Sequence, residues 1–219
     1  MITFLHTSPV HVSTFDRLLA QIAPGMPAVH MVDEALLADA RRLAVEHPDV
    51  VVRVSESVNE AAASGSSVVL CTCSTIGGIA ERVETQGRFL AMRIDRPMAD
   101  EAVRLGPSVL IVAALDSTLA PTTALVQSSA DRRSLPVRVT AVAVPEAWGH
   151  FERGDMEAYL GEIAAAVRAA ASGHSVVVLA QASMACAQVL LADLGIPVLS
   201  SPRLGVVAAV HACNVRRSA

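Results

Sequence analysis

The sequence SSVVLCTCSTIGG at residues 66–78 joins a β-branched apolar run to two cysteines, two hydroxyl residues and a glycine pair. The run Val68–Cys71 predicts a buried strand, and a helical pattern follows it. A strand of this kind carries a thiol and small hydrogen-bonding groups to its carboxyl end, where open α/β sheets bind their ligands. Cys73 is therefore the first candidate for a functional residue.

Apolar strands and helical segments alternate along the rest of the chain. Strands are predicted at Ile2–His6, Ala28–Val32, Val68–Cys71, Phe89–Arg93, Val109–Ala114, Val137–Val144, Ser175–Leu179 and Pro197–Ser200. Helices are predicted at 13–22, 35–46, 56–64, 75–86, 121–132, 156–171, 184–194 and 204–212. This alternation is typical of parallel sheets that helices cover on both faces, and it predicts an α/β fold.

The sequence contains a weak internal repeat. Residues 66–74 and 175–183 share a Ser, an apolar run ending in Leu and a second Ser, and a helix is predicted after each. One interpretation is chance similarity between two buried strands. The other is two similar α/β halves, and a cleft between two halves is a common ligand site.

The composition argues against several classes of protein. The chain has 219 residues, 53% of them hydrophobic and only 3% aromatic, with a net charge of −4, so neither a nucleic-acid partner nor base stacking is expected. The apolar runs are too short to span a membrane, and the first residues do not resemble a signal peptide. The four cysteines match no zinc or disulfide pattern. We therefore expect a cytoplasmic protein with reduced thiols and no metal.

Several polar residues follow the predicted strands. A helix beginning near Ser74 and Thr75 would bind a carboxylate and favour the thiolate form of a nearby cysteine. Either hydroxyl could instead cap that helix. The same two interpretations apply to Ser117 and Thr118, and Pro121 fits the first turn of the helix that would follow.

Residues at other strand ends could have either a functional or a structural role. Gln181 could hydrogen-bond loop backbone or donate its amide to a substrate oxygen. Thr7 and Ser8 close the first strand. We expect structural roles for His6 and His30, and packing roles for Cys71, Cys186 and Cys213.

Together these segments resemble the aspartate/glutamate/hydantoin racemase superfamily over nearly the whole chain. Cys73-Ser74-Thr75 is similar to the family's first Cys-Asn-Thr motif, with Ser in place of Asn. RIDRPMADEA at 93–102 and VLIVAALDSTLAPT at 109–122 resemble its central segment. VVLAQASMA at 177–185 and LGIPVLSS at 194–201 resemble its second motif and the strand after it.

The resemblance implies two Rossmann-like domains with parallel sheets, related by a pseudo-twofold axis, with the active site in the cleft between them. We expect a first domain of residues 1–96 plus 202–219 and a second of residues 97–201. In the family, two cysteines face each other across the substrate's α-carbon and need no cofactor. One thiolate removes the proton and the other thiol returns one to the opposite face.

This chain departs from the family pattern at the second cysteine. Ungapped matching places Gln181 there, whereas the internal repeat places Ala182 there. The expected function is therefore a cofactor-independent, racemase-like isomerase with Cys73 as acid–base residue or nucleophile and Gln181 orienting the substrate.

The same resemblance implies a set of substrate-binding residues and an open choice of activity. The implied binding residues are Thr7, Ser8, Ser74, Thr75, Ser117, Thr118 and Ser183. The substrate would be a small carboxylic or amino acid, and a homodimer is the common state in the family. A decarboxylase of a substituted malonate and a non-catalytic carboxylate-binding protein are the alternatives.

Overall fold

The computed structural model describes residues 1–218, which divide into two compact units. The first unit comprises Met1–Asp95 and the C-terminal segment that begins at Pro202, and the second comprises Arg96–Ser201. Each unit contains one four-stranded sheet in which all neighbouring strands are parallel. The sequence prediction of an α/β fold with two parallel sheets is confirmed.

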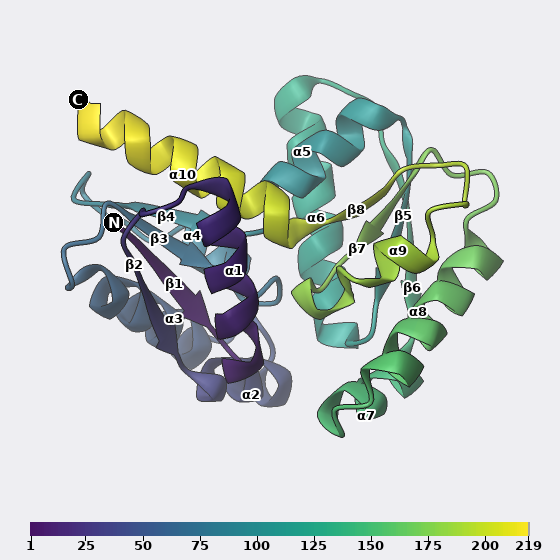
Figure 1. The fold of residues 1–219 in the computed structure, drawn as a ribbon, viewed down its shortest axis with the longest axis horizontal. Helices are drawn as coiled ribbons and strands as arrows, with labels where there is room; N and C mark the ends of the chain where they lie inside the picture. The colour runs from purple at the N-terminus through teal and green to yellow at the C-terminus, as the bar shows by residue number, and fades with distance from the viewer. Residues whose placement is uncertain (219) are drawn as a thin grey trace. The chain divides into compact units, whose positions relative to one another are not determined.

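The first unit builds its sheet in the order β2-β1-β3-β4 (Figure 1). Its elements are β1 (Ile2–His6), η1 (Pro9–His11), α1 (Val12–Ile22), β2 (Ala28–Val32), α2 (Glu34–Leu43), α3 (Pro48–Ala62), β3 (Val68–Cys71), α4 (Gly77–Glu81), β4 (Leu90–Arg93) and α10 (Ser201–Ser218).

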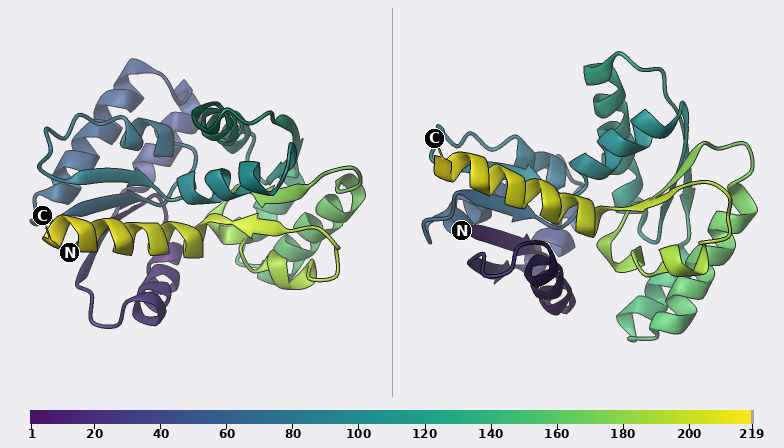
Figure 2. Two further views of the ribbon diagram at one scale, coloured as in Figure 1. Left: turned by 90° about the horizontal axis from the view of Figure 1, so that it is seen from above. Right: turned by 45° about the horizontal axis from the view of Figure 1, so that its top comes forward.

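Helices cover both faces of this sheet. On one face, apolar residues of α2, α3 and α4 form a core with Leu5, Val69 and Cys71 of the strands. α1 and α10 lie on the other face, as the two views of Figure 2 show. There the rings of Phe4 and Phe15 pack with their centroids 5.5 Å apart. Strands buried on both sides explain the uniformly apolar runs in the sequence.

The second unit repeats the arrangement with the sheet order β6-β5-β7-β8. Its elements are α5 (Arg96–Leu105), β5 (Ser108–Ala113), α6 (Asp116–Arg133), β6 (Arg138–Ala143), α7 (Pro145–Glu152), α8 (Met156–Ala170), β7 (Val176–Leu179), η2 (Ala182–Met184), α9 (Ala187–Leu190) and β8 (Val198–Ser200). Apolar residues of α7, α8 and α9 form a core on one face with Leu110, Val112 and Leu179.

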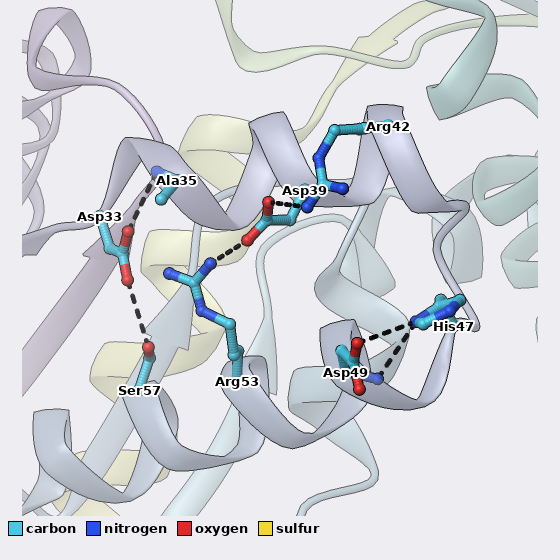
Figure 3. A network of polar contacts seen from close by, with 8 residues as sticks. All are labelled: Asp33, Ala35, Asp39, Arg42, His47, Asp49, Arg53 and Ser57. Atoms are coloured by element: carbon cyan, nitrogen blue, oxygen red, sulfur yellow. Dashed lines mark hydrogen bonds and ion pairs between the residues drawn. The ribbon is translucent and has the colours of Figure 1, made fainter.

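Polar contacts hold α2 and α3 together beside the strand ends of the first unit (Figure 3). Asp33 follows β2 and caps α2, because its carboxylate accepts a hydrogen bond from the Ala35 N–H at 3.0 Å. The same carboxylate accepts from the Ser57 hydroxyl of α3 at 3.4 Å. Arg53 of α3 forms an ion pair with Asp39 of α2. These contacts fix the crossover that leads from β2 to β3.

The strands agree with the sequence prediction, whereas several helices differ. β1, β2 and β3 have the predicted bounds, and each other strand differs by one residue at one or both ends. The helices α5 and α7 were not predicted at all. The predicted helix 184–194 is wrong, because that segment contains the short elements η2 and α9 separated by turns.

Within residues 1–218, none of the helices combines the length and the apolar composition that a membrane span requires.

Candidate active site

The first unit has its topological switch point between β1 and β3. The chain leaves β1 to form β2 on one side, and β3 lies on the other side of β1. In open parallel sheets, ligands bind outside the carboxyl ends of the two strands at such a point. Thr7 and Ser8 follow β1, and Cys73 and Ser74 follow β3 by two and three residues. The sheet register therefore brings these four predicted site residues to the same edge.

Cys73 and Cys71 have different environments. Cys73 is half-buried, and its side chain packs against the edge of the apolar core. Cys71 is fully buried within that core, and its Sγ lies 3.7 Å from the Cys73 carbonyl oxygen. Burial raises the pKa of the Cys71 thiol above its ordinary value, and the neighbouring Cys73 adds to this effect. Cys71 therefore stays a protonated packing residue, as the sequence predicted, and Cys73 is the accessible thiol.

The segment after Cys73 is a turn and not the predicted helix 75–86. α4 begins only at Gly77 and ends at Glu81. The prediction that Ser74 or Thr75 caps this helix is wrong, because Ile76 occupies the N-cap without a side-chain hydrogen bond. The predicted helix could not have reached its end in any case, because Gln86 and Gly87 adopt positive φ angles of 51° and 74°. Any anion binding beside Cys73 therefore depends on the turn and not on a helix terminus.

A buried ion pair supports this turn from below. Arg93 Nε and Nη2 lie 2.6 and 3.0 Å from the two carboxylate oxygens of Asp95, and Nη2 also donates to the Ser74 carbonyl at 3.3 Å. Both side chains are at most 4% exposed. Burial is the largest single effect and disfavours the Arg93 cation, but the charge and hydrogen bonds of Asp95, together with the charge of Glu81, outweigh it and raise the pKa of Arg93.

The glycine pair makes room for Arg93. A Cβ atom on Gly77 would lie 3.1 Å from the Arg93 Cβ, and one on Gly78 would lie 3.3 Å from Nη1. Sequence reasoning missed the role of Arg93 and Asp95. The available signal was an Arg-x-Asp sequence at the carboxyl end of β4, the strand that pairs with β3.

The second unit has an equivalent switch point between β5 and β7. Ser117 and Thr118 lie in the first turn of α6, which begins at Asp116, so Pro121 is inside the helix and not in its first turn. The Ser117 hydroxyl oxygen is buried, and among residues 1–218 it has no hydrogen-bond partner. Gln181 and Ser183 follow β7.

The sheet registers decide which residue of the second unit corresponds to Cys73. Leu5 pairs with Cys71, and Val112 pairs with Leu179. In each unit the next residue donates its N–H to the partner strand, Thr72 to Leu5 and Ala180 to Val112, both at 3.0 Å. Counting one residue further places Gln181, and not Ala182, at the position that Cys73 has in the first unit.

Gln181 bridges the two strand ends of its unit. Its Oε1 accepts hydrogen bonds from the Ala114 and Leu115 N–H groups at 2.6 and 3.2 Å. By the same register, these two residues correspond to Thr7 and Ser8. The carboxamide oxygen is thus committed to backbone, which leaves the carboxamide nitrogen as the donor that a substrate could meet.

Ser183 has a partner of its own. Its hydroxyl lies 2.7 Å from the hydroxyl of Tyr159. Burial raises the pKa of Tyr159 to about 12, so the phenol keeps its proton at neutral pH. The Tyr159 contact therefore fixes the orientation of the Ser183 side chain.

The two remaining cysteines differ from each other. Cys213 is buried in α10, where its Sγ lies 3.4 Å from the Met1 amino group, and this confirms a packing role. Cys186 is exposed immediately before α9, so the prediction that it packs is wrong. Within residues 1–218, no cluster of three or more His, Cys, Asp or Glu side chains is arranged to hold a metal ion.

Comparisons with known proteins place the fold. No protein-family model matches the chain, and no curated protein matches its sequence. Solved structures do match over nearly the whole chain. The aspartate racemase of Picrophilus torridus has a TM-score of 0.71 and 11% identity, over 97% of this chain and 94% of that one. The chain has the fold of the aspartate and glutamate racemases.

Two further racemase structures agree. A glutamate racemase isoform from Bacillus anthracis gives a TM-score of 0.70 at 12% identity, covering 99% of this chain and 82% of that one. The allantoin racemase of Pseudomonas fluorescens gives 0.61 at 19% identity, covering 99% and 91%. The α/β fold with two parallel four-stranded sheets, which the resemblance to the racemase superfamily implied, is thereby confirmed, and at these identities the likeness concerns the fold.

Proposed function

We propose that the chain is a cofactor-independent isomerase of the racemase type that acts at the α-carbon of a small carboxylic or amino acid. The observation that carries this proposal is the half-buried Cys73 thiol at the switch point of a racemase fold. It shares that edge of the sheet with Thr7, Ser8 and Ser74. A thiol in this position has the access that an acid–base residue needs.

The proposed step is a proton transfer between carbon and sulfur. The Cys73 thiolate takes the α-proton, so the C–H bond breaks, an S–H bond forms and the electron pair moves into the substrate carboxylate. Backbone N–H groups and hydroxyls stabilise the oxygen that gains charge. Returning the proton restores the thiolate and the C–H bond. In a double-bond isomerase, the same thiolate would add to the substrate as a nucleophile.

The proposal gives a binding role to the hydroxyls around the strand ends. In the first unit these residues are Thr7, Ser8, Ser74 and Thr75, and in the second they are Ser117, Thr118 and Ser183. Arg93 lies under the turn that follows Cys73, but its charge is already paired with Asp95. A substrate carboxylate would therefore be bound by hydroxyls and backbone N–H groups, as the scarcity of cations in these motifs suggests.

Gln181 determines the stereochemical outcome that we propose. It stands where the register would place a second acid, and a carboxamide does not exchange protons at neutral pH. The proton therefore returns to the face from which Cys73 removed it. We expect the enzyme to exchange the α-proton with solvent faster than it inverts the carbon.

The test is α-deuterium exchange in D2O over a panel of amino acids, hydantoins and substituted malonates, together with isomerisation of maleates, both read by NMR. Cys73→Ser should abolish exchange, because an alcohol is far less acidic than a thiol. Cys186→Ser removes the other thiol that is not buried and serves as the control, because loss of exchange in Cys73→Ser alone assigns the reaction to Cys73. Unchanged exchange in Cys73→Ser would refute the assignment of Cys73.

One observation favours a second candidate, a carboxylate-binding protein without turnover. The Gln181 side chain already accepts hydrogen bonds from two N–H groups at the switch point of the second unit, so the position that corresponds to Cys73 carries a carboxamide in place of a thiol. This candidate requires thermal stabilisation by a carboxylate that survives Cys73→Ala, with no exchange by the wild type. Release of CO2 from a substituted malonate, abolished by Cys73→Ala, would instead indicate a decarboxylase.

A further inference from the structure

A chain of hydrogen bonds runs from the surface of the first unit to the strand end that carries Cys73. His30 Nε2 lies 2.9 Å from Asp16 Oδ1, and His30 Nδ1 lies 2.8 Å from His6 Nε2. His6 Nδ1 in turn lies 2.8 Å from the Thr72 hydroxyl. That hydroxyl is also 3.1 Å from the Leu5 carbonyl oxygen. Thr72 immediately precedes Cys73 in the sequence.

The residues at the two ends of this series of hydrogen bonds restrict which atoms can donate. Asp16 is 63% exposed, and its carboxylate is an acceptor only. His6 is fully buried, and Thr72 is 3% exposed. The Thr72 hydroxyl has one hydrogen, so it can donate either to the Leu5 carbonyl or to His6 Nδ1, but not to both.

Counting the hydrogens on these four side chains leaves two arrangements in which each hydrogen bond has one donor and one acceptor. In both, the Asp16 carboxylate requires a hydrogen on His30 Nε2. When His30 is neutral, its Nδ1 is an acceptor, so His6 must carry its hydrogen on Nε2 and Thr72 must donate to His6 Nδ1. When His30 is protonated, its Nδ1 is a donor. His6 must then carry its hydrogen on Nδ1, and the Thr72 hydroxyl must turn to the Leu5 carbonyl.

We propose that Asp16, His30, His6 and Thr72 form a relay in which protonation of His30 reverses the hydrogen-bond direction as far as the residue before Cys73. The two arrangements differ by one proton, which comes from solvent. His6 does not change its charge and only changes which ring nitrogen carries its hydrogen. The relay thus converts the pH of the solvent into the orientation of a hydroxyl at the candidate site.

The surroundings of His6 favour a residue that stays neutral. Burial, and then the nearby His30 and His11, lower the pKa of His6 to about 3. Burial lowers the pKa of His11 as well. Aromatic rings also pack against the relay. Phe4 stacks on His30 with centroids 4.9 Å apart, and Phe15 lies 5.4 Å from the His6 ring centroid. When His30 is protonated, its charge faces the Asp16 carboxylate.

Any effect of the relay on turnover rests on the proposed function of Cys73, whereas the relay itself does not depend on that function. Its direct test is a pH titration of the 15N-labelled protein, in which long-range 1H–15N correlations report which ring nitrogen carries hydrogen. Histidine side chains ordinarily titrate near pH 6.5, so the scan should cover about pH 5 to 8. We expect the His6 hydrogen to move from Nδ1 to Nε2 as His30 loses its proton. A His6 that keeps one tautomer throughout, or becomes an imidazolium in this range, would overturn the proposal.

Two variants, each with a matched control, test the relay further. Thr72→Val keeps the shape but removes the hydroxyl, so protonated His30 would leave the His6 Nδ1–H buried without an acceptor. The change of the His6 tautomer should therefore move to lower pH, whereas Thr72→Ser should keep it at the wild-type pH. Asp16→Ala removes the anchor at an exposed position, so neutral His30 should populate both tautomers and His6 should become a mixture at high pH. Asp49→Ala removes another exposed carboxylate beside a histidine and should leave the switch intact.

Thermal melts of each variant report whether the fold is kept. A Thr72→Val protein whose tautomer change occurs at the wild-type pH would contradict the relay. If deuterium exchange fails for every substrate while the tautomer change is observed, the proposed function is wrong and the relay stands. If exchange depends on Cys73 but the His6 tautomer is constant, the relay is wrong and the proposed function stands.

Discussion

The buried pair of Arg93 and Asp95 allows a quantitative prediction from the substitution Asp95→Asn. Asparagine has nearly the same shape as aspartate but no charge, and it offers one acceptor oxygen where the carboxylate offers two. The carboxylate now accepts two hydrogen bonds from Arg93, at 2.6 and 3.0 Å. In the variant, one guanidinium N–H would face an amide NH2 group, and the Arg93 charge would remain buried without a counter-ion.

Removing one partner of a buried ion pair costs about 3–5 kcal/mol. Because asparagine keeps one of the two acceptors, we expect the lower end, about 3 kcal/mol of unfolding free energy. Single domains are stable by roughly 5–15 kcal/mol, so this is a large fraction of the total. For a chain of this size it corresponds to a fall in Tm of roughly 6–12 °C.

Urea unfolding followed by circular dichroism measures this change directly. The matched control is Asp193→Asn, which disrupts an Arg168–Asp193 pair of similar geometry in which the two side chains are 44% and 72% exposed. The control should stay close to the wild type, because solvent screens that pair. An Asp95→Asn protein as stable as the control would refute the argument that the buried charge needs its partner.

Three further results are expected. Gln181→Cys places a thiol at the position corresponding to Cys73, so inversion of the α-carbon should rise relative to exchange, as chiral chromatography would show; exchange that stays strictly retentive would contradict the register. The pKa of His6 is depressed to about 3 from 6.5 in the unfolded chain, so unfolding free energy should fall as pH drops from about 6.5 towards 3, less steeply in His6→Gln. Gly205→Ala forces a Cβ against the side chain and carbonyl of Ile94 and should cost about 1–3 kcal/mol, whereas Gly161→Ala meets open space and should stabilise by up to about 1 kcal/mol, both measured by thermal melts.

The strands were predictable because each is a short apolar run bounded by polar or turn residues. In the run Val68–Cys71, every residue is buried on one face of the sheet or the other, so the pattern is strong and continuous. The register that decides between Gln181 and Ala182 is not a property of either segment alone. It emerges only when each strand is paired with its neighbour.

The helices were less predictable because tertiary contacts and turn conformations override the local helical periodicity of the sequence. The segment 75–86 has helical periodicity, but Gly77 packs against Arg93 and the positive φ of Gln86 turns the chain. α5 begins at Arg96, within a segment that is rich in charge and contains a proline at its second position. Its apolar face becomes evident only against β7 and β8.

Part of the candidate site could be found from the ends of strands. Cys73, Thr7 and Ser8 follow from the rule that ligands bind at carboxyl ends. The pairing of Arg93 with Asp95, and the contact of His6 with His30, could not be found in this way. Each joins side chains from different strands or turns, whose directions depend on the folded packing.

The return of α10 to the first unit has a consequence for synthesis of the chain. Val206, Ala209 and Cys213 of this helix are fully buried, and Cys213 lies beside the amino group of Met1. During translation the ribosome must therefore complete all of Arg96–Ser201 before the opening segment receives its last covering helix. The middle of the polypeptide can finish folding first, while the nascent amino-terminal portion waits with one face of its sheet covered by α1 alone, a natural point for chaperone protection.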